Sequence, residues 1–511
     1  MAEGLLAGLA AAACLAVAGF APGIVNRLLA LPVRVFPGAA PPSHYAALLQ
    51  STALSWAVLL PIAVLVYASV PRRAGRFHRG VATGLTPSVA TLLVALVVTG
   101  AALVPRQRTG DEPAYLIMAQ SLVRDGDLQA PEAGKELHPS TQARPGVVVS
   151  KHPPGLAFLI AFPRELAGEI GLRAVLAATA VGLVALLIRL LVPWLGTEGA
   201  SLTGLLLGIS FPIAPYASLV FPDLPAALCV ALLTAHLSGV YETPVAPALA
   251  MAFLPWLNPR MLPPAVLFLA WAWLDRKAGR RSRAGLTVAL VGSLAIMAWV
   301  HLRWFGSPSP FAARWGEGHL FSLSDLLPGL LGVLVDQQYG LLVWAPVFVL
   351  LPVGLAVLWR RSRGTAVGLL LLAGATCMPG ILHVWTAGWS PAARYLVPAL
   401  PFLAIPVGLG LIEGLHARGW RYRFTQLVVV AQLAIGLLSV MIPGKLFGTL
   451  ESAPRNYYFD LAGRLLHFDP SVLVPTLLHG PPWRSQLHAG LLVLLWMAIS
   501  WLWVRRAPET V

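Results

Sequence analysis

Long apolar stretches separated by short polar segments are the main pattern of this chain. The clearest of them lie near residues 47–69, 84–104, 172–193, 339–358, 424–443 and 488–504. Each is close to the length of about 20 residues that a helix needs to cross a bilayer. An open sheet cannot satisfy its backbone polar groups in lipid, so the spanning elements must be helices. The pattern predicts an all-α, polytopic membrane protein.

Composition strengthens this prediction. Hydrophobic residues make up 57% of the 511 residues, and charged residues make up 11%. An ordinary soluble domain carries about 25% charged residues. A soluble chain with this composition would expose much of its apolar surface to water, whereas a membrane protein would place that surface in lipid.

The net charge of +15 comes largely from basic clusters in short loops. If these loops are cytoplasmic, the orientation of every segment is consistent with roughly 14 spans and with both termini inside. This placement argues against a nucleic-acid partner and for contact with membrane lipids. The clusters are Arg72, Arg73, Arg76 and Arg79; Arg276, Lys277, Arg280, Arg281 and Arg283; Arg360, Arg361 and Arg363; Arg418, Arg421 and Arg423; and Arg505 and Arg506.

The same orientation places three longer segments, residues 105–171, 305–338 and 444–487, on the outer side. We therefore divide the chain into N-terminal transmembrane helices (1–83), a transmembrane core (84–443), and an outer loop with a final helix (444–511). The first outer segment is rich in acidic residues, and outer loops commonly carry binding or catalytic sites. No internal repeat is visible in the sequence.

Short helices are expected within the first outer loop. Glu112-Pro113 is a helix-start signal, and the helix should stop at Asp125-Gly126-Asp127. Its apolar face is too short to span, which predicts an interfacial helix. A second short apolar run, Leu156 to Phe162, could also lie along the membrane or dip into it. The apolar face of the first helix comprises Leu116, Ala119, Leu122 and Val123.

Adjacent carboxylates at Asp111 and Glu112 could supply chemistry at this helix start. A carboxylate there can act as general base toward an attacking hydroxyl. Phosphate leaves readily as an anion, so transfer from a sugar phosphate needs one base and a cation rather than the acid–base pair of glycoside hydrolysis. The alternative is structural, with both acids capping the helix and favouring its dipole.

Three further charged residues fall at predicted outer helix ends. Asp223 lies in Phe221-Pro222-Asp223-Leu224-Pro225, where it could act in a site or belong to a solvated turn. Arg260 and Arg394 lie on the side where arginine is less expected, and guanidinium binds phosphate bidentately. The alternative for these arginines is interfacial anchoring beside Trp and Tyr.

Metal and disulfide chemistry have weaker support. The outer-side histidines show no ligand spacing that would indicate a metal site, although a divalent ion held by carboxylates remains open. The three cysteines are far apart and are expected to pack as small apolar residues. The N-terminus, apolar from Leu5, is read as a retained helix rather than a cleaved signal. The histidines are His138, His152, His319 and His383; the cysteines are Cys14, Cys229 and Cys377.

Several stretches between about residues 84 and 415 together resemble bacterial GT-C glycosyltransferases, in particular the protein O-mannosyltransferase and aminoarabinose-transferase-like families (glycosyltransferase family 39 type). Where this chain has Asp223, the families often have glutamate. The stretches are Thr109 to Tyr115, Ser121 to Leu128, Lys151 to Gly155, Phe221 to Ala227, Leu254 to Arg260, Asp336 to Leu342 and Gly388 to Tyr395.

The resemblance implies a GT-C-type helical fold and an inverting transfer of sugar from a polyprenyl-phosphate donor to a lipid, glycan or protein acceptor. It further implies a multi-pass protein of the bacterial inner membrane with its catalytic loops on the outer face. Asp111 would be the catalytic base, Glu112 its support, and Asp223 would position the acceptor or a metal. The donor phosphate would meet Arg260 and Arg394, while Tyr115, His152 and Tyr395 are further site candidates. The families differ in metal dependence, which leaves the cofactor open.

Two other classes of protein remain as alternatives. A transporter or lipid flippase would need no transfer chemistry, but such proteins usually carry ionisable residues deep in the bilayer and internal repeats. A catalytically inactive scaffold subunit is the third possibility. Convergence of Asp111, Asp223 and Arg394 on one outer cavity would favour an enzyme, whereas their dispersal over separate faces would favour the alternatives.

Overall fold

A computed structural model describes residues 85–103, 108, 110–128, 140–144, 147–275, 279–311, 323–386, 390–441, 459, 463, 467, 470–478 and 482–505. The predicted helices of region 1–83, with the span at 47–69, lie outside the described residues. So do His138, His319 and Cys14.

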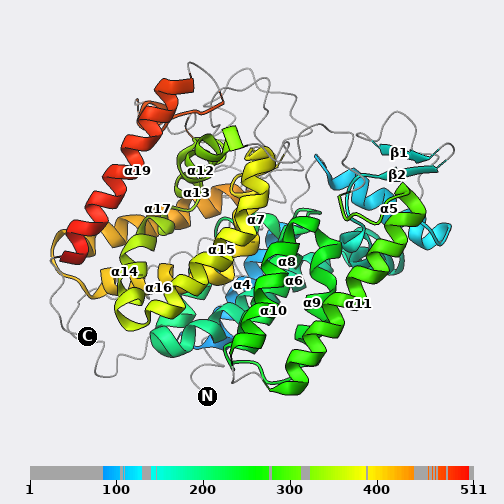
Figure 1. Cartoon of the computed structure of the whole chain (residues 1–511). Coiled ribbons are helices and arrows are strands. Elements are labelled where there is room, and N and C mark those ends of the chain that lie inside the picture. Colours follow the sequence, from blue (N-terminus) through cyan, green and yellow to red (C-terminus); the bar gives the residue numbers. More distant parts are fainter. Residues whose placement is uncertain are drawn as a thin grey trace, which may run out of the picture.

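The described chain is predominantly helical, as Figure 1 shows. Its α-helices are α4 (Pro87–Leu103), α5 (Glu112–Arg124), α6 (Gly155–Gly208), α7 (Ile213–Tyr216), α8 (Asp223–Leu237), α9 (Val245–Leu257), α10 (Leu262–Leu274), α11 (Arg280–Phe305), α12 (Leu326–Val335), α13 (Leu341–Trp344), α14 (Leu351–Arg361), α15 (Arg363–Val384), α16 (Leu400–His416), α17 (Trp420–Met441) and α19 (Pro482–Arg505). Short 3-10 helices are η2 (Pro259–Met261), η4 (Leu323–Asp325), η5 (Pro346–Leu350), η6 (Arg394–Ala399) and η8 (Pro470–Leu473). Two strands, β1 (Ser140–Arg144) and β2 (Val147–Ser150), pair antiparallel in the first predicted outer loop.

Six helical segments among the described residues are long and apolar enough to cross a membrane. They are Gly155–Gly208, Arg280–Trp304, Arg363–His383, Arg394–His416, Trp420–Val440 and Trp483–Arg505. The protein is therefore an α-helical, multi-pass membrane protein, as the apolar pattern predicts. The number of spans, roughly 14 from loop charge, stays a prediction.

The longest of these segments, α6, is not one straight helix. Ala167, Gly168 and Gly196 have non-helical backbone angles, so α6 consists of successive helical pieces. The first piece contains the apolar run from Leu156 to Phe162, and the second contains the span expected near residues 172–193. The backbone break at Gly168, where φ is 58°, needs the conformational freedom of glycine.

The predicted span near residues 339–358 is wrong as a single helix. This region divides into α13, η5 and α14. Pro346 and Pro352 explain the division, because proline removes a backbone N–H and restricts the residue before it. The apolar residues of this stretch correctly predict that it is largely buried, but they do not predict whether it forms one continuous helix.

Two of the predicted outer loops also contain more structure than expected. Residues 305–338 include η4 and α12, which packs against α15 and α19. Residues 444–487 include η8 and the beginning of α19. Both segments are therefore partly helical parts of the packed molecule, not solvated connections alone.

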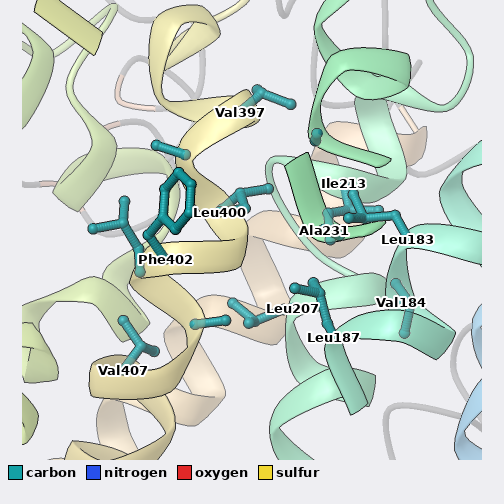
Figure 2. Close-up of a cluster of buried hydrophobic side chains, with 14 of the residues drawn as sticks. Leu183, Val184, Leu187, Leu207, Ile213, Ala231, Val397, Leu400, Phe402 and Val407 are labelled. Atoms are coloured by element: carbon teal, nitrogen blue, oxygen red, sulfur yellow. The ribbon is translucent and has the colours of Figure 1, made fainter. Parts of the chain in front are cut away.

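A hydrophobic core joins α6, α7, α8, η6 and α16 (Figure 2). Leu183 and Leu187 of α6 lie with Ile213 of α7 and Ala231 of α8, and Leu400 and Phe402 of α16 extend the cluster. The free cysteines Cys229 and Cys377 are both buried, in agreement with their expected packing role. This core holds the first turns of α8 and η6, which carry Asp223 and Arg394.

The helices that follow the site residues lead away from them toward the basic loops. Asp223 begins α8, Arg260 comes two residues before α10, and Arg394 begins η6, which continues into α16. A helix of the length of α16 extends for about 25 Å. At the far ends, Arg361 donates a hydrogen bond to the Trp194 carbonyl, and His236 is hydrogen-bonded to Ser282. The basic residues at 280–283, 360–363 and 418–423, which the structure describes, thus lie at the opposite end of these helices from the candidate site.

Candidate functional site

Asp111 lies directly before α5, which begins at Glu112-Pro113 as the sequence predicts. It occupies the N-cap position, yet its side chain makes no capping hydrogen bond. Instead, Oδ2 of Asp111 accepts a hydrogen bond from Nη2 of Arg394 at 2.8 Å. The side chain is 27% exposed. The capping interpretation of this residue is therefore wrong, because a distant guanidinium takes the place of the helix N–H groups.

Asp223 is the first residue of α8, and its side chain is fully buried. Oδ2 accepts a hydrogen bond from Nε of Arg394 at 3.0 Å. Oδ1 accepts a hydrogen bond from Nη2 of Arg260. The interpretation of this residue as part of a solvated turn is wrong, since a buried carboxylate needs partners and here has two arginines.

Four candidate residues therefore meet in one charge network. Arg394 bridges Asp111 and Asp223, and Asp223 also binds Arg260. These residues come from the starts of α5 and α8, from η2, and from η6, which lie far apart in the sequence. Two guanidinium groups face two carboxylates, so the formal charges balance.

Arg394 is held by the backbone before it. Ala393 has a left-handed conformation with φ of 53°, which is uncommon for a residue with a side chain. The Tyr216 hydroxyl donates toward the carbonyl oxygens of Pro391 and Ala392, each at 3.1 Å. The Arg394 guanidinium also lies over the Phe221 ring at 4.4 Å from the centroid.

Tyr216 keeps its proton under ordinary conditions. Burial is the main cause that raises the pKa of its hydroxyl well above the usual value, and the negative charge of Asp223 adds to the effect. A protonated hydroxyl can donate to the carbonyls of the Arg394 loop, whereas a phenolate could not.

Arg260 is positioned by its own short segment and by an aromatic ring. The Asn258 side chain accepts a hydrogen bond from the Arg260 backbone N–H at 3.1 Å, which caps η2. The guanidinium stacks over the ring of Tyr395 at 4.5 Å from the centroid. Its Nε is buried and donates no hydrogen bond to the residues that the structure describes. A buried donor of this kind is one that a bound anion could satisfy.

Glu112 differs from its neighbour Asp111. It is fully buried, and its Oε1 accepts a hydrogen bond from the Val220 backbone N–H at 2.7 Å. This bond fastens the start of α5 to the segment before α8. The expected apolar face of α5 is also partly buried, since Leu116 and Ala119 pack in a cluster with the first piece of α6.

Tyr115 and His152 lie beside Asp111. Nε2 of His152 is 3.8 Å from Oδ1 of Asp111, and the rings of Tyr115 and His152 are 5.5 Å apart. The Ser150 hydroxyl accepts a hydrogen bond from the His152 backbone N–H at 3.1 Å. All eight site residues expected from the sequence are thus brought to one region.

A cavity of about 200 Å³ adjoins this region. Its wall includes Val220, whose N–H binds Glu112, and the ion-paired side chains of Arg108, Glu169 and Arg173. The remaining wall is mostly apolar, contributed by α4 and α6. The cavity therefore lies beside the segment to which Glu112 is hydrogen-bonded, and none of the four residues of the charge network is among its lining residues.

A metal centre has no clear set of ligands in the described part of the chain, where no group of three or more His, Cys, Asp or Glu side chains is placed to hold an ion. The carboxylates of Asp111 and Asp223 are directed to arginines.

Three contributors to the site were not proposed from the sequence as functional residues: Tyr216, Phe221 and Asn258. Phe221 and Asn258 lie inside the motifs that carry Asp223 and Arg260, so their position in these motifs could have indicated that they belong to the site. Tyr216 lies in a short proline-containing segment with no charged residue to distinguish it. Only its hydroxyl contacts with the Arg394 loop reveal its role.

Comparison with known proteins gives similarity only at the level of solved structures. No protein-family model matches the chain, and no curated protein matches its sequence. Similar structures include that of ArnT from Cupriavidus metallidurans bound to undecaprenyl phosphate, with 20% identity, a TM-score of 0.49, and coverage of 82% of this chain and 77% of that one. The apo state of the same protein has 21% identity and a TM-score of 0.48, with the same coverage of 82% and 77%.

The oligosaccharyltransferase of Archaeoglobus fulgidus, in complex with Zn and sulfate, is also similar, with 13% identity and a TM-score of 0.42 over 75% of this chain and 57% of that one. ArnT is an aminoarabinose transferase, so one of the families named from the sequence motifs is represented among these structures. TM-scores below 0.5 do not establish a shared function, and the contacts of the site itself carry the proposal that follows.

Proposed function

We propose that this protein is a membrane glycosyltransferase that transfers a sugar from a polyprenyl-phosphate donor to an acceptor hydroxyl at the outer face of the membrane. The observation that carries the proposal is the charge network of Asp111, Asp223, Arg260 and Arg394. It joins a partly exposed carboxylate directly to Arg394 and, through Asp223, to Arg260. A base and a phosphate-binding cation are the two components that this transfer needs.

The proposed reaction has one bond-forming and one bond-breaking event. The acceptor oxygen attacks the anomeric carbon of the donor sugar, and its proton passes to Asp111. The bond between that carbon and the phosphate oxygen breaks, and its electron pair leaves with the phosphate. Attack opposite the leaving group inverts the configuration of the anomeric carbon.

The exposure of the two carboxylates supports a division of roles. Asp111 is 27% exposed and can meet an acceptor hydroxyl, whereas Asp223 is fully buried. We assign Asp223 to holding Arg260 and Arg394, in place of the acceptor- or metal-positioning role suggested by the resemblance. Glu112 is assigned to fastening α5, because it is buried against the Val220 backbone.

The two arginines would stabilise the departing phosphate. Guanidinium binds phosphate oxygens in a planar, charge-assisted geometry. The buried Nε of Arg260 has no acceptor among the described residues, and a phosphate oxygen could provide one. The polyprenyl tail would remain among the apolar helices, and the acceptor, whether lipid, glycan or protein, would approach Asp111.

The assignment of the site to the outer side of the membrane is based on the basic residues of the loops. The site lies at the opposite end of α8, α10 and α16 from the basic residues at 280–283 and 418–423. If those clusters are cytoplasmic, the site faces outward. Labelling of a cysteine introduced at Gly110 by a membrane-impermeant reagent tests this directly. Labelling only after the membrane is opened would place the site on the inner side and overturn the proposal.

The decisive experiment compares D111N with a matched control, D125N. Asp125 is an exposed carboxylate at the other end of α5. Cells lacking the gene are complemented with each variant, membrane levels are equalised, and envelope lipids and glycans are analysed by mass spectrometry. We expect D111N to lose the transferred sugar by at least about 1,000-fold, since the base and its contact with Arg394 are both impaired, while D125N keeps it.

Unaltered product in D111N would remove Asp111 from the mechanism. A wild-type protein that moves a polyprenyl-phosphate lipid across proteoliposomes without changing its mass would instead identify a transporter or flippase. Absence of both activities, with a partner enzyme failing in the deletion strain, would identify a scaffold subunit.

A further inference from the structure

The turn at residues 336–340, between α12 and α13, lies against the loop that carries Arg394. Asp336 in this turn is fully buried. Its Oδ1 accepts hydrogen bonds from the backbone N–H groups of Gln338 at 2.8 Å and Tyr339 at 3.0 Å. At Gly340 a side-chain carbon would come 2.4 Å from the Asp336 carbonyl oxygen, so this tight turn needs glycine there. The carboxylate therefore fixes the course of the backbone through Tyr339.

The same carboxylate fastens a distant part of the chain. Oδ2 of Asp336 accepts a hydrogen bond from the Leu477 backbone N–H at 2.8 Å. Beside it, the Gln337 N–H donates to the Pro475 carbonyl at 3.1 Å. The segment at residues 470–478, which precedes α19, is thus joined to the turn by adjacent hydrogen bonds.

On its other side, the turn reaches the site. The Tyr339 carbonyl accepts a hydrogen bond from the Ala393 N–H at 3.1 Å. Ala393 has a left-handed backbone with φ of 53° and directly precedes Arg394. An alanine adopts this conformation at a cost, so surrounding contacts must hold it. The bonds from Tyr339 and Tyr216 together hold the loop that presents Arg394 to both carboxylates.

We propose that Asp336 is a positioning residue for Arg394, acting through the Tyr339 carbonyl and the Ala393 backbone, and that it makes the site depend on segment 470–478. The link to donor binding rests on the function proposed above for Arg394. The positioning itself does not, because it concerns the conformation of residues 390–394 in the protein without ligand.

Hydrogen–deuterium exchange of the purified full-length protein tests the positioning. D336A removes both oxygens, while D336N keeps an acceptor for the turn but cannot accept the Leu477 N–H. The control is D325N, at the other end of α12, where the N-cap side chain makes no capping bond. We expect exchange of peptides covering residues 390–399 to rise about tenfold in D336A and less in D336N. Peptides from α8 should be unchanged, and D325N should behave as wild type.

Undecaprenyl phosphate binding gives the second readout. Its Kd should rise about tenfold in D336A, in parallel with loop exchange, because a displaced guanidinium loses its charge-assisted contacts. If D336A fails to fold, the same two measurements are made on D336N, which lacks only the hydrogen bond to the Leu477 N–H.

Unchanged exchange at residues 390–399 in both variants would overturn this inference, as would a uniform rise that includes α8. Faster exchange of the loop in a protein whose wild type neither binds undecaprenyl phosphate nor transfers sugar would support the positioning role and overturn the proposed function instead.

Discussion

The starts of α5 and α8 present the same local pattern in two different environments. Each has an aspartate two residues before a proline at a helix start, and each aspartate accepts a hydrogen bond from Arg394. Asp111 remains 27% exposed, while Asp223 is fully buried and binds Arg260 as well. Under the proposed function, exposure rather than residue type separates the carboxylate that meets the substrate from the one that orients the arginines.

The largest effect should follow from D223A, which tests the buried member of the comparison. Removing one partner of a buried charge network costs about 3–5 kcal/mol, because the remaining charges lose their compensation. We expect a lower midpoint of thermal unfolding in detergent together with loss of transfer, whereas D111N should affect transfer far more than stability. Equal unfolding midpoints for D223A and wild type would show that burial does not distinguish the two aspartates.

A smaller effect is expected from R394K, because this substitution breaks the bridge between Asp111 and Asp223. Lysine keeps the positive charge but has no planar fork with which to reach Asp111 and Asp223 together. The kcat/KM for the polyprenyl-phosphate donor should fall about 100-fold, comparable to losing one preorganised donor at a reacting oxygen. R260K, which leaves the bridge between the helices intact, is the matched variant and should fall less. An R394K enzyme with full activity would make the bridge irrelevant.

The smallest effect is expected from E112Q, at the buried carboxylate beside Asp111. The glutamine Oε1 can still accept the Val220 N–H, so α5 keeps its attachment. Transfer should fall no more than about threefold, given that neutral amide and carboxylate oxygens both accept this bond. A loss as large as that of D111N would return Glu112 to the mechanism as a proton acceptor.

Local signals predicted local structure well. The Glu112-Pro113 start and the Asp125-Gly126 stop match α5 closely, since capping and proline effects depend on neighbouring residues. The apolar runs at 424–443 and 488–504 correspond to α17 and α19. The run at 339–358 did not remain one helix, because hydrophobicity records the preference for an apolar environment and prolines decide continuity.

The roles of individual site residues were less predictable. Helix capping was the natural local interpretation of Asp111, and a solvated turn was a fair interpretation of Asp223. Both interpretations were wrong because each aspartate binds Arg394, which lies 283 residues from Asp111 and 171 from Asp223 along the chain. The resemblance to known motifs pointed to residues that the structure brings together, without indicating how they contact one another.

The amino-acid pattern alone was enough to predict the membrane-spanning helical character of this protein, and it indicated the clustering of basic residues in short loops and the residues worth considering for a site. These properties follow from local composition and periodicity, which set how each segment partitions between water and lipid. The folded structure was needed to show that one guanidinium joins two carboxylates, that one of these is buried, and that the turn containing Asp336 is hydrogen-bonded to the loop before Arg394. Those outcomes depend on contacts between distant segments, and packing alone determines which segments meet.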